Sequence, residues 1–265
     1  MRLFWVDAFT DKIFSGNPAG VVPLDSWLPD ERMRLIAFEN GLAETAFFVR
    51  TGADRFHLRW FTPAVEVDLC GHATLASAFV VFNELGQPGT RITFDSRSGP
   101  LHVTRRPTGE LELDFPTCAP VEENSPTLRD QVTAALGADL VWLGRSAWDL
   151  FAVVANPTAL GALTPDFERV RALGHRGISI TAAGGPPGID FVSRWFGPQS
   201  GVPEDPVTGS AHCALAPYWL QRLGKNPLRA RQISARGGEI LCTVEGPRVR
   251  LAGRAALYLR GEIVG

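Results

Sequence analysis

The pentapeptide "RWFTP" at residues 59–63 returns as "RWFGP" at residues 194–198. The chain contains 7 Trp residues, so chance is a poor explanation for a second copy of Arg-Trp-Phe-x-Pro. If the similarity extends beyond these positions, the chain is an internal duplication. A duplication would determine the fold before any single motif is considered.

The similarity does extend in both directions, in the same order and at a nearly constant offset. Three further pairs of segments match: "PDERMRLI" (29–36) with "PDFERVRAL" (165–173), "GHATLASAFVVFNELG" (71–86) with "GSAHCALAPYWLQRLG" (209–224), and "RSGPLHVT" (97–104) with "RGGEILCT" (236–243). Short motifs can recur because helices and turns share sequence preferences, but a shared order and spacing need another cause. We therefore interpret the chain as two related halves, residues 1–117 and 118–265.

Length and composition limit the class of protein. With 265 residues, each half is long enough to bury a core of its own. The net charge of −2 gives no general attraction to nucleic acid or to an anionic membrane surface. The first residues lack the pattern of a signal peptide, and no segment reaches transmembrane length. The 4 cysteines show no close-paired spacing, so we expect a reduced, cytoplasmic protein.

The segment 73–82 has an unusual polarity for a helix. Its only polar side chains are those of Thr74 and Ser77, so a helix here is apolar around nearly its whole circumference. A surface helix would instead show one apolar stripe, and this segment is too short to cross a membrane comfortably. We therefore predict an α+β fold of two pseudo-symmetric halves, each a curved, mostly antiparallel sheet wrapped around a central apolar helix.

Both central helices are expected to begin at a glycine, with "GHA" at 71–73 and "GSA" at 209–211. The first N–H groups of a helix have no partner inside the helix, and the helix dipole favours an anion there. If the halves pack with pseudo-twofold symmetry, both helix N-termini face one cleft. We therefore expect a pocket for a small substrate that carries a carboxylate.

The two halves differ at residues that are suited to proton transfer. Glu44 stands at the head of an otherwise apolar strand, and the register with the pentapeptide places it opposite Ser179. Loss of solvation strengthens a carboxylate as a base, so Glu44 is a candidate general base; a salt bridge at a strand end is the alternative. Asp205 is either a turn residue or a site residue. His72 is either a helix cap or a proton carrier, and Ser210 suits a helix cap in either case.

Several motifs in this order resemble one protein family. The strings "VDAFT", "SGNPAGVV", "NGLAETAFF", "FTPAVEVDLCGHAT" and "EDPVTGSAH" are similar to those of the phenazine-biosynthesis isomerase (PhzF-like) family, which has the diaminopimelate-epimerase fold. The resemblance is collinear over nearly the full length. It implies two similar halves with the active site between them, no cofactor and a homodimer.

The resemblance also assigns roles to particular residues. The Glu of the "ETAF" motif is the family's acid and base at carbon, and it matches Glu44. The matching catalytic residues are His72, Asp205 and Ser210, of which the last two line the pocket around the substrate amine and carboxylate. The remaining positions expected to bind substrate are Asn17, Gly71, Ala73, Thr208 and Gly209. One departure is Ala43, where many relatives carry Ser; it affects local hydrogen bonding and not the base.

We predict a cofactor-independent isomerase that moves a proton between carbons of a small, cyclic or amino-acid-like carboxylate. A racemase or epimerase of the same fold is one alternative. Such enzymes use one thiol per half; Cys70 stands where the first would be, but Cys213 aligns with Leu75 inside the helix, so the second is missing. A carboxylate-binding protein that has lost its reaction is another alternative.

A metal enzyme is a further alternative. Cys70, His72, His212 and Cys213 are all ligand types, and they would approach one another where the two helices converge. Their spacing is not usual for a metal site, so we predict no metal. The expected partners are a small-molecule substrate and a second copy of the chain.

Overall fold

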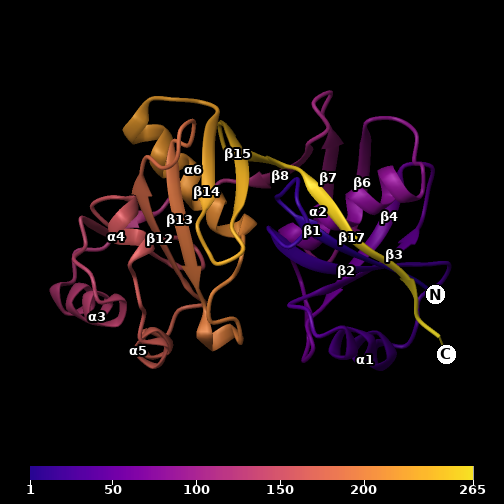
Figure 1. The fold of residues 1–265 in the computed structure, drawn as a ribbon, viewed down its shortest axis with the longest axis horizontal. Helices are drawn as coiled ribbons and strands as arrows, with labels where there is room; N and C mark the ends of the chain where they lie inside the picture. Colours follow the sequence, from indigo (N-terminus) through magenta and orange to yellow (C-terminus); the bar gives the residue numbers. More distant parts are fainter. Residues whose placement is uncertain (265) are drawn as a thin grey trace. The chain divides into compact units, whose positions relative to one another are not determined.

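The computed structural model describes residues 1–264 and divides the chain into two compact units (Figure 1). Unit 1 comprises Met1–Phe115 and the chain from Arg250 onward, and unit 2 comprises Pro116–Val249. The last strand joins unit 1 because β17 (Ala255–Glu262) pairs along β1 (Arg2–Ala8). The second predicted half therefore contributes its final strand to the first unit.

Unit 1 is one curved sheet with two helical crossovers. Its remaining elements are β2 (Asn17–Leu24), α1 (Asp30–Asn40), β3 (Thr45–Arg50), β4 (Arg55–Phe61), β5 (Glu66–Val67), α2 (Gly71–Phe79), the π-helical turn η1 (Val80–Glu84), β6 (Arg91–Ser96), β7 (Gly99–Arg105) and β8 (Leu111–Pro116). The sheet runs β17-β1-β2-β3-β4-β6-β7-β8, with β5 paired to one end of β4. Only β2–β3 and β4–β6 are parallel among these pairings.

Unit 2 repeats this plan. Its elements are β9 (Val121–Glu122), α3 (Pro126–Leu136), β10 (Trp142–Arg145), β11 (Leu150–Val153), α4 (Pro157–Gly161), α5 (Phe167–Ala172), β12 (Ile178–Ala183), β13 (Phe191–Phe196), the short helix η2 (Pro198–Ser200), α6 (Gly209–Leu223), β14 (Leu228–Gln232) and β15 (Gly238–Glu245). The chain returns to unit 1 within β16 (Arg248–Gly253). The sheet runs β9-β10-β11-β12-β13-β14-β15, in which β11–β12 and β13–β14 are the parallel pairs.

The order of strand directions shows the duplication directly. From β1 to β7 the successive pairings are antiparallel, parallel, antiparallel, parallel and antiparallel, and the same series runs from β10 to β15. A parallel pair needs a crossover, and the matching crossovers carry α1 and α2 in unit 1, and α4, α5 and α6 in unit 2. The predicted α+β fold of two pseudo-symmetric halves is confirmed.

The helix predicted over 73–82 is the core of unit 1. The strands curve around α2, which is buried on all sides and continues into the π-helical turn (Figure 1). Its two polar side chains are satisfied within the helix: Thr74 Oγ1 donates to the Cys70 carbonyl at 2.6 Å, and Ser77 Oγ donates to the Ala73 carbonyl at 2.7 Å. In unit 2, α6 is buried in the same way from Ala211 to Trp219.

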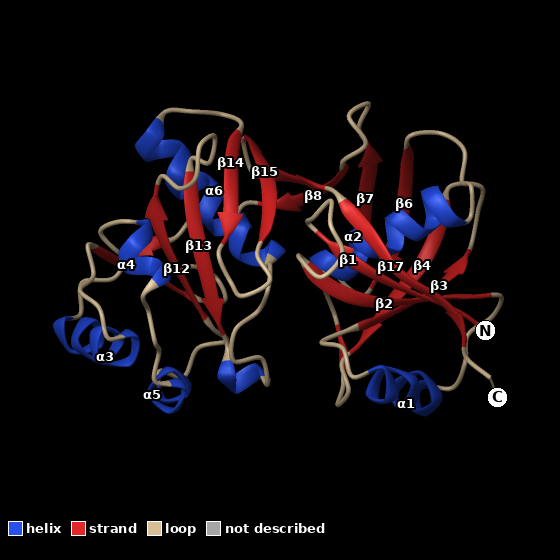
Figure 2. Ribbon diagram, viewed as in Figure 1, coloured by secondary structure: helices blue, strands red, loops and turns tan. Residues whose placement is uncertain are grey.

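The strand after Glu44 is buried on both faces. Phe47 packs with α1, while Phe48 on the opposite face contacts Phe56 and Phe94. Figure 2 shows α1 and α2 on opposite sides of β2 and β3. Because both faces are covered, this strand is an uninterrupted apolar run, and the carboxylate that precedes it sits at the edge of the core.

The predicted match between Glu44 and Ser179 is wrong. Phe61 pairs with Thr45 in unit 1, and its repeat partner Phe196 pairs with Ile178 in unit 2, so the residue equivalent to Glu44 is Gly177. The hairpin loop between β12 and β13 is longer than the loop between β3 and β4, and this shifts the register. Counting back from the pentapeptide therefore does not find the equivalent of Glu44, because the two loops differ in length.

His212 is a core residue of unit 2. It is fully buried, its Nδ1 donates to the Thr208 carbonyl at 2.8 Å, and its ring lies 6.1 Å from that of Phe191. Its Nε2 makes no hydrogen bond within residues 1–264. Burial lowers the pKa of His212 to about 4. No helix among the described residues combines the length and apolar character needed to cross a membrane.

The buried neutral ring makes the protein less stable in acid. Unfolding restores an ordinary pKa near 6.5, so between pH 6.5 and 4 the unfolded chain binds a proton at His212 and the folded chain does not. This difference leaves the free energy of unfolding unchanged above pH 6.5. As the pH falls from 6.5 towards 4, the difference lowers the free energy of unfolding by about 3 kcal/mol in total. We expect His212→Asn to flatten the pH dependence of the unfolding free energy between pH 6.5 and 4.5, measured with urea. His57→Gln, at a half-buried histidine of unit 1, serves as the control for replacing a histidine elsewhere in the chain.

Candidate active site

Glu44 stands at the point where the chain enters the core of unit 1. Helix α1 ends at Gly41 in the left-handed conformation, with φ 63°, as the Asn40-Gly41 pair predicts. Three residues later Glu44 immediately precedes β3, and its carbonyl accepts from the Gly20 N–H at 3.2 Å. Its side chain is 18% exposed, so the carboxylate lies at the surface of the core and is still reachable.

Cys70 and His72 come to the same place from the start of α2. Cys70 is the N-cap residue in an extended conformation, and His72 is the second residue of the helix. His72 Nε2 lies 3.3 Å from Glu44 Oε2, and Nδ1 lies 3.5 Å from Cys70 Sγ. Glu44 Oε2 forms an ion-pair contact but no hydrogen bond within residues 1–264. The sequence predicted Glu44 and His72 as site residues, and the structure brings them into contact.

The charges of this cluster decide its protonation. Burial is the largest influence on the pKa of His72 and favours the neutral ring, but Cys70 and Glu44 outweigh it, so the pKa of His72 is raised well above its ordinary value. Burial, with the charge of Glu44, raises the pKa of the Cys70 thiol. The contact with Glu44 therefore favours a protonated His72 ring.

The protonation of His72 can be checked by titration. We expect its Cε1–H resonance in proton NMR to shift at a pH well above the ordinary histidine range. Glu44→Gln removes the partner carboxylate, so the midpoint should move to lower pH, whereas Glu39→Gln, at an exposed acid of α1, should leave it in place. An unchanged midpoint in Glu44→Gln would show that the carboxylate does not act on the ring.

The same three side chains could hold a metal ion. One ligand atom from each of Glu44, Cys70 and His72 lies within 4.8 Å of the others. In unit 2, His212 and Cys213 each contact a carbonyl of their own helix region, Thr208 and Gly209 respectively. Burial raises the pKa of Cys213 to about 12, which disfavours the thiolate that a metal requires. The prediction of no metal stays a prediction.

Asp205 and Thr208 belong to a tightly bonded loop that leads into α6. Thr208 Oγ1 donates to Asp205 Oδ2 at 2.5 Å, so this hydroxyl does not cap its helix. Gln232 Nε2 donates to the Asp205 carbonyl at 2.6 Å, and Thr208 N–H donates to Gln232 Oε1 at 2.9 Å. These bonds fix the loop from β14. The sequence does not single out Gln232, because a lone amide in a strand carries no motif.

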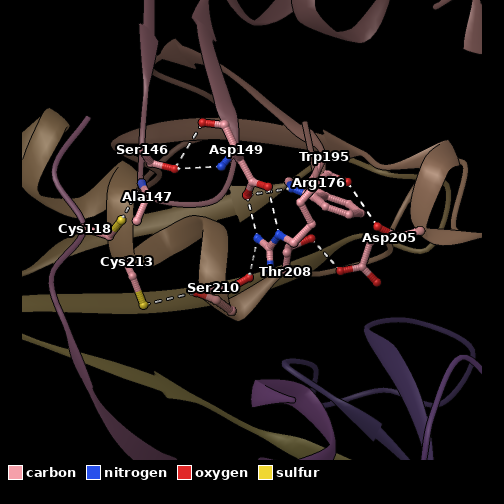
Figure 3. A network of polar contacts seen from close by, with 12 residues as sticks. Cys118, Ser146, Ala147, Asp149, Arg176, Trp195, Asp205, Thr208, Ser210 and Cys213 are labelled. Atoms are coloured by element: carbon pink, nitrogen blue, oxygen red, sulfur yellow. Dashed lines mark hydrogen bonds and ion pairs between the residues drawn. The ribbon is translucent and has the colours of Figure 1, made fainter. Parts of the chain in front are cut away.

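Ser210 belongs to a second polar cluster, which the sequence does not predict (Figure 3). Arg176 Nη2 donates to Ser210 Oγ at 3.1 Å and to Asp149 Oδ2 at 2.6 Å, while Nε donates to Asp149 Oδ1 at 2.9 Å. Trp195 Nε1 donates to the same carboxylate at 3.1 Å. The available signals in the sequence were an Asp directly before the strand β11 and an Arg two residues before the strand β12.

The other predicted substrate-binding residues lie at the start of a helix or a strand. Gly71 and Ala73 flank His72 in the first turn of α2, and Gly209 begins α6. Asn17 is fully buried at the start of β2, the strand next to β3. The predicted set thus forms two groups, one in each unit, and their joint role around one substrate stays a prediction.

Similarity to known proteins covers the whole chain. Residues 6–261 match the PhzC-PhzF family, described as phenazine biosynthesis-like protein. An uncharacterized isomerase of Pseudomonas aeruginosa is 50% identical over 263 residues, which cover 99% of this chain and 98% of that protein. The crystal structure of a phenazine biosynthesis protein of the PhzF family from Enterococcus faecalis has a TM-score of 0.93 at 44% identity, covering 99% and 98% of the two chains.

A more distant structure relates the fold to racemases. A probable proline racemase from Agrobacterium radiobacter, with bound carbonate, has a TM-score of 0.62 at 12% identity and covers 99% of this chain and 92% of that chain. At this identity the likeness concerns the fold alone, and it agrees with the predicted epimerase-like architecture. On the full-length match and the close structural agreement, the chain belongs to the PhzC-PhzF family of phenazine biosynthesis-like proteins.

Proposed function

We propose that this protein is an isomerase that moves a proton between two carbons of a small, unsaturated carboxylic acid, with Glu44 as the acid and base. The observation that carries the proposal is the contact of 3.3 Å between Glu44 Oε2 and His72 Nε2 at the start of a buried helix. It places a carboxylate without a hydrogen bond on Oε2 beside a cation. The close relative described as an isomerase supports the reaction class.

The chemistry needs no redox partner. Glu44 removes a proton from carbon, and the electron pair of the broken C–H bond spreads into the conjugated system of the substrate. The neutral Glu44 carboxyl then returns the proton to another carbon, so the double bond moves. The His72 cation and the N–H groups at the start of α2 stabilise the delocalised anion, which lowers the barrier where negative charge develops.

Asp205, Thr208 and Ser210 are proposed to bind the polar groups of the substrate. The loop that carries Asp205 and Thr208 is fixed by Gln232, and a fixed loop loses little conformational entropy when a ligand binds. The chain is also proposed to act in the cytoplasm as a homodimer. All four cysteines are free thiols, in keeping with a reducing compartment.

A racemase with one thiol per half is less well supported. Gly71 and Gly209 begin the two central helices, so the residue equivalent to Cys70 is Thr208. An aliphatic hydroxyl is a much weaker acid than a thiol, so without further activation it is not deprotonated. It therefore cannot accept a proton from the substrate as a thiolate does. The thiol of Cys213 lies within α6 and has a raised pKa.

A panel of cyclic and amino-acid-like unsaturated carboxylic acids tests the proposed function. We expect at least one member to give a product of the same mass with a different chromatographic retention, as required when only a double bond moves. Binding of panel members by calorimetry with no such product from any of them would instead favour the non-catalytic carboxylate-binding protein.

A further inference from the structure

Arg176 makes, in unit 2, the contact that Glu44 makes in unit 1. Gly177 is the equivalent of Glu44, and Ser210 is the equivalent of His72. A carboxylate contacts an imidazole at this place in unit 1, and a guanidinium contacts a hydroxyl at this place in unit 2, at 3.1 Å. The duplication therefore presents a group of opposite charge at the matching helix start.

The guanidinium is held in one orientation. Asp149, whose side chain is 3% exposed, binds Nε and Nη2 in a two-pronged contact, and Trp195 Nε1 donates to the same carboxylate (Figure 3). A guanidinium fixed in this way is already ordered before a ligand arrives, so binding costs less side-chain entropy.

Two hydrogen-bond donors of the cluster remain available. Arg176 Nη1 makes no hydrogen bond to any described residue, and the Arg176 side chain is 39% exposed. Ser210 Oγ accepts from Arg176, so its own hydrogen is free to be donated. Two donors on side chains that contact each other could serve the two oxygens of a carboxylate.

An exposed aromatic ring lies beside these donors. Trp148 occupies the turn between β10 and β11 and is 40% exposed, and the Arg176 Cζ lies 5.6 Å from its ring centroid. The Ser146 hydroxyl donates to the Asp149 carbonyl and accepts from the Asp149 N–H, and these bonds fix the turn that carries Trp148. A large exposed ring next to a cation offers a flat apolar surface for a planar ligand.

We propose that Arg176, Ser210 and Trp148 bind the carboxylate and the adjoining flat body of a planar, unsaturated carboxylic acid, and that Arg176 determines specificity for the carboxylate. The proposal rests on the proposed function, because it names the substrate class of that reaction. The competing explanation is that Arg176 only neutralises the buried Asp149. If Arg176 only neutralises Asp149, a ligand with a carboxylate and the same ligand with an amide should bind with equal affinity.

The test uses benzoate as the probe and benzamide as its neutral counterpart. The full chain, labelled with 15N, is titrated while the indole N–H signal of Trp148, assigned with Trp148→Phe, is followed by NMR. We expect benzoate to shift this signal in a saturable way and benzamide to bind about tenfold or more weakly. Arg176→Lys keeps the positive charge but loses the fork, and it should weaken benzoate about tenfold.

A second variant guards against misfolding. Asp149→Asn combined with Arg176→Gln removes both charges, so no buried charge is left unpaired, and it should also lose the preference for benzoate. No shift with benzoate, equal binding of benzamide, or unchanged affinity in both variants would overturn the proposal. Equal competition by inorganic phosphate would overturn the carboxylate assignment. Benzoate cannot isomerise, so this titration succeeds or fails independently of turnover by Glu44.

Discussion

Replacing Glu44 with glutamine lowers the rate of proton exchange at carbon by about 10²–10⁴-fold, the usual contribution of a positioned acid or base. Glutamine keeps the size of the side chain but can neither take up a proton nor carry the charge that faces His72. Glu44 Oε2 makes no hydrogen bond within the described part of the chain, so the interaction removed at that atom is the contact with His72. The measurement is deuterium uptake from heavy water by a substrate that the wild type converts.

The control for this variant is another glutamate of the same region. Glu39 is exposed on α1, a few residues before Glu44 in the chain, and Glu39→Gln should exchange at the wild-type rate. The unfolding curve of Glu39→Gln should match the wild type to within about 1 kcal/mol, whereas Glu44→Gln loses the contact with His72 and is checked for a cooperative unfolding transition before its rate is compared. Undiminished deuterium uptake by a folded Glu44→Gln protein would exclude Glu44 as the base.

Replacing Gly177 with alanine destabilises the protein by about 2–3 kcal/mol. A Cβ at this position would lie 2.2 Å from the Trp195 ring and 2.9 Å from the Phe196 carbonyl oxygen. The ring cannot move freely because its Nε1 donates to Asp149. The free energy of unfolding in urea, together with the m-value, measures the change.

Gly161 provides the matched control for this substitution. It ends α4, and a Cβ added there would lie 4.0 Å from its nearest neighbour, the Ile233 Cδ1. Gly161→Ala should leave stability unchanged or raise it by up to about 1 kcal/mol, because alanine favours helix more than glycine does. If Gly177→Ala were equally harmless, the place equivalent to Glu44 would have room for a side chain, contrary to the close packing of Trp195.

The fold was predictable because its main signals repeat within the sequence. The pentapeptide of β4 recurs in β13, and the apolar segments after Gly71 and Gly209 recur as α2 and α6. An apolar helix must be enclosed, which predicts the curved sheets. The register between the halves was not predictable, since it depends on the length of one hairpin loop.

The site was predictable only in part. Glu44 and His72 carry motif signals, and the structure joins them at 3.3 Å. The cluster of Asp149, Arg176 and Trp195 was not predicted, because its members are far apart in the chain and become neighbours only when β11, β12 and β13 pair. Charged residues placed just before apolar strands are too common to indicate a site on their own.

The position of deuterium in the product tests the central claim most directly. A substrate converted in heavy water is analysed by proton and deuterium NMR for the carbon that gains the label and for the configuration of its stereocentres. The account predicts deuterium at a carbon other than the one that lost its proton, with the double bond moved. Deuterium returned to the original carbon with inverted configuration would contradict it and identify a racemase or epimerase.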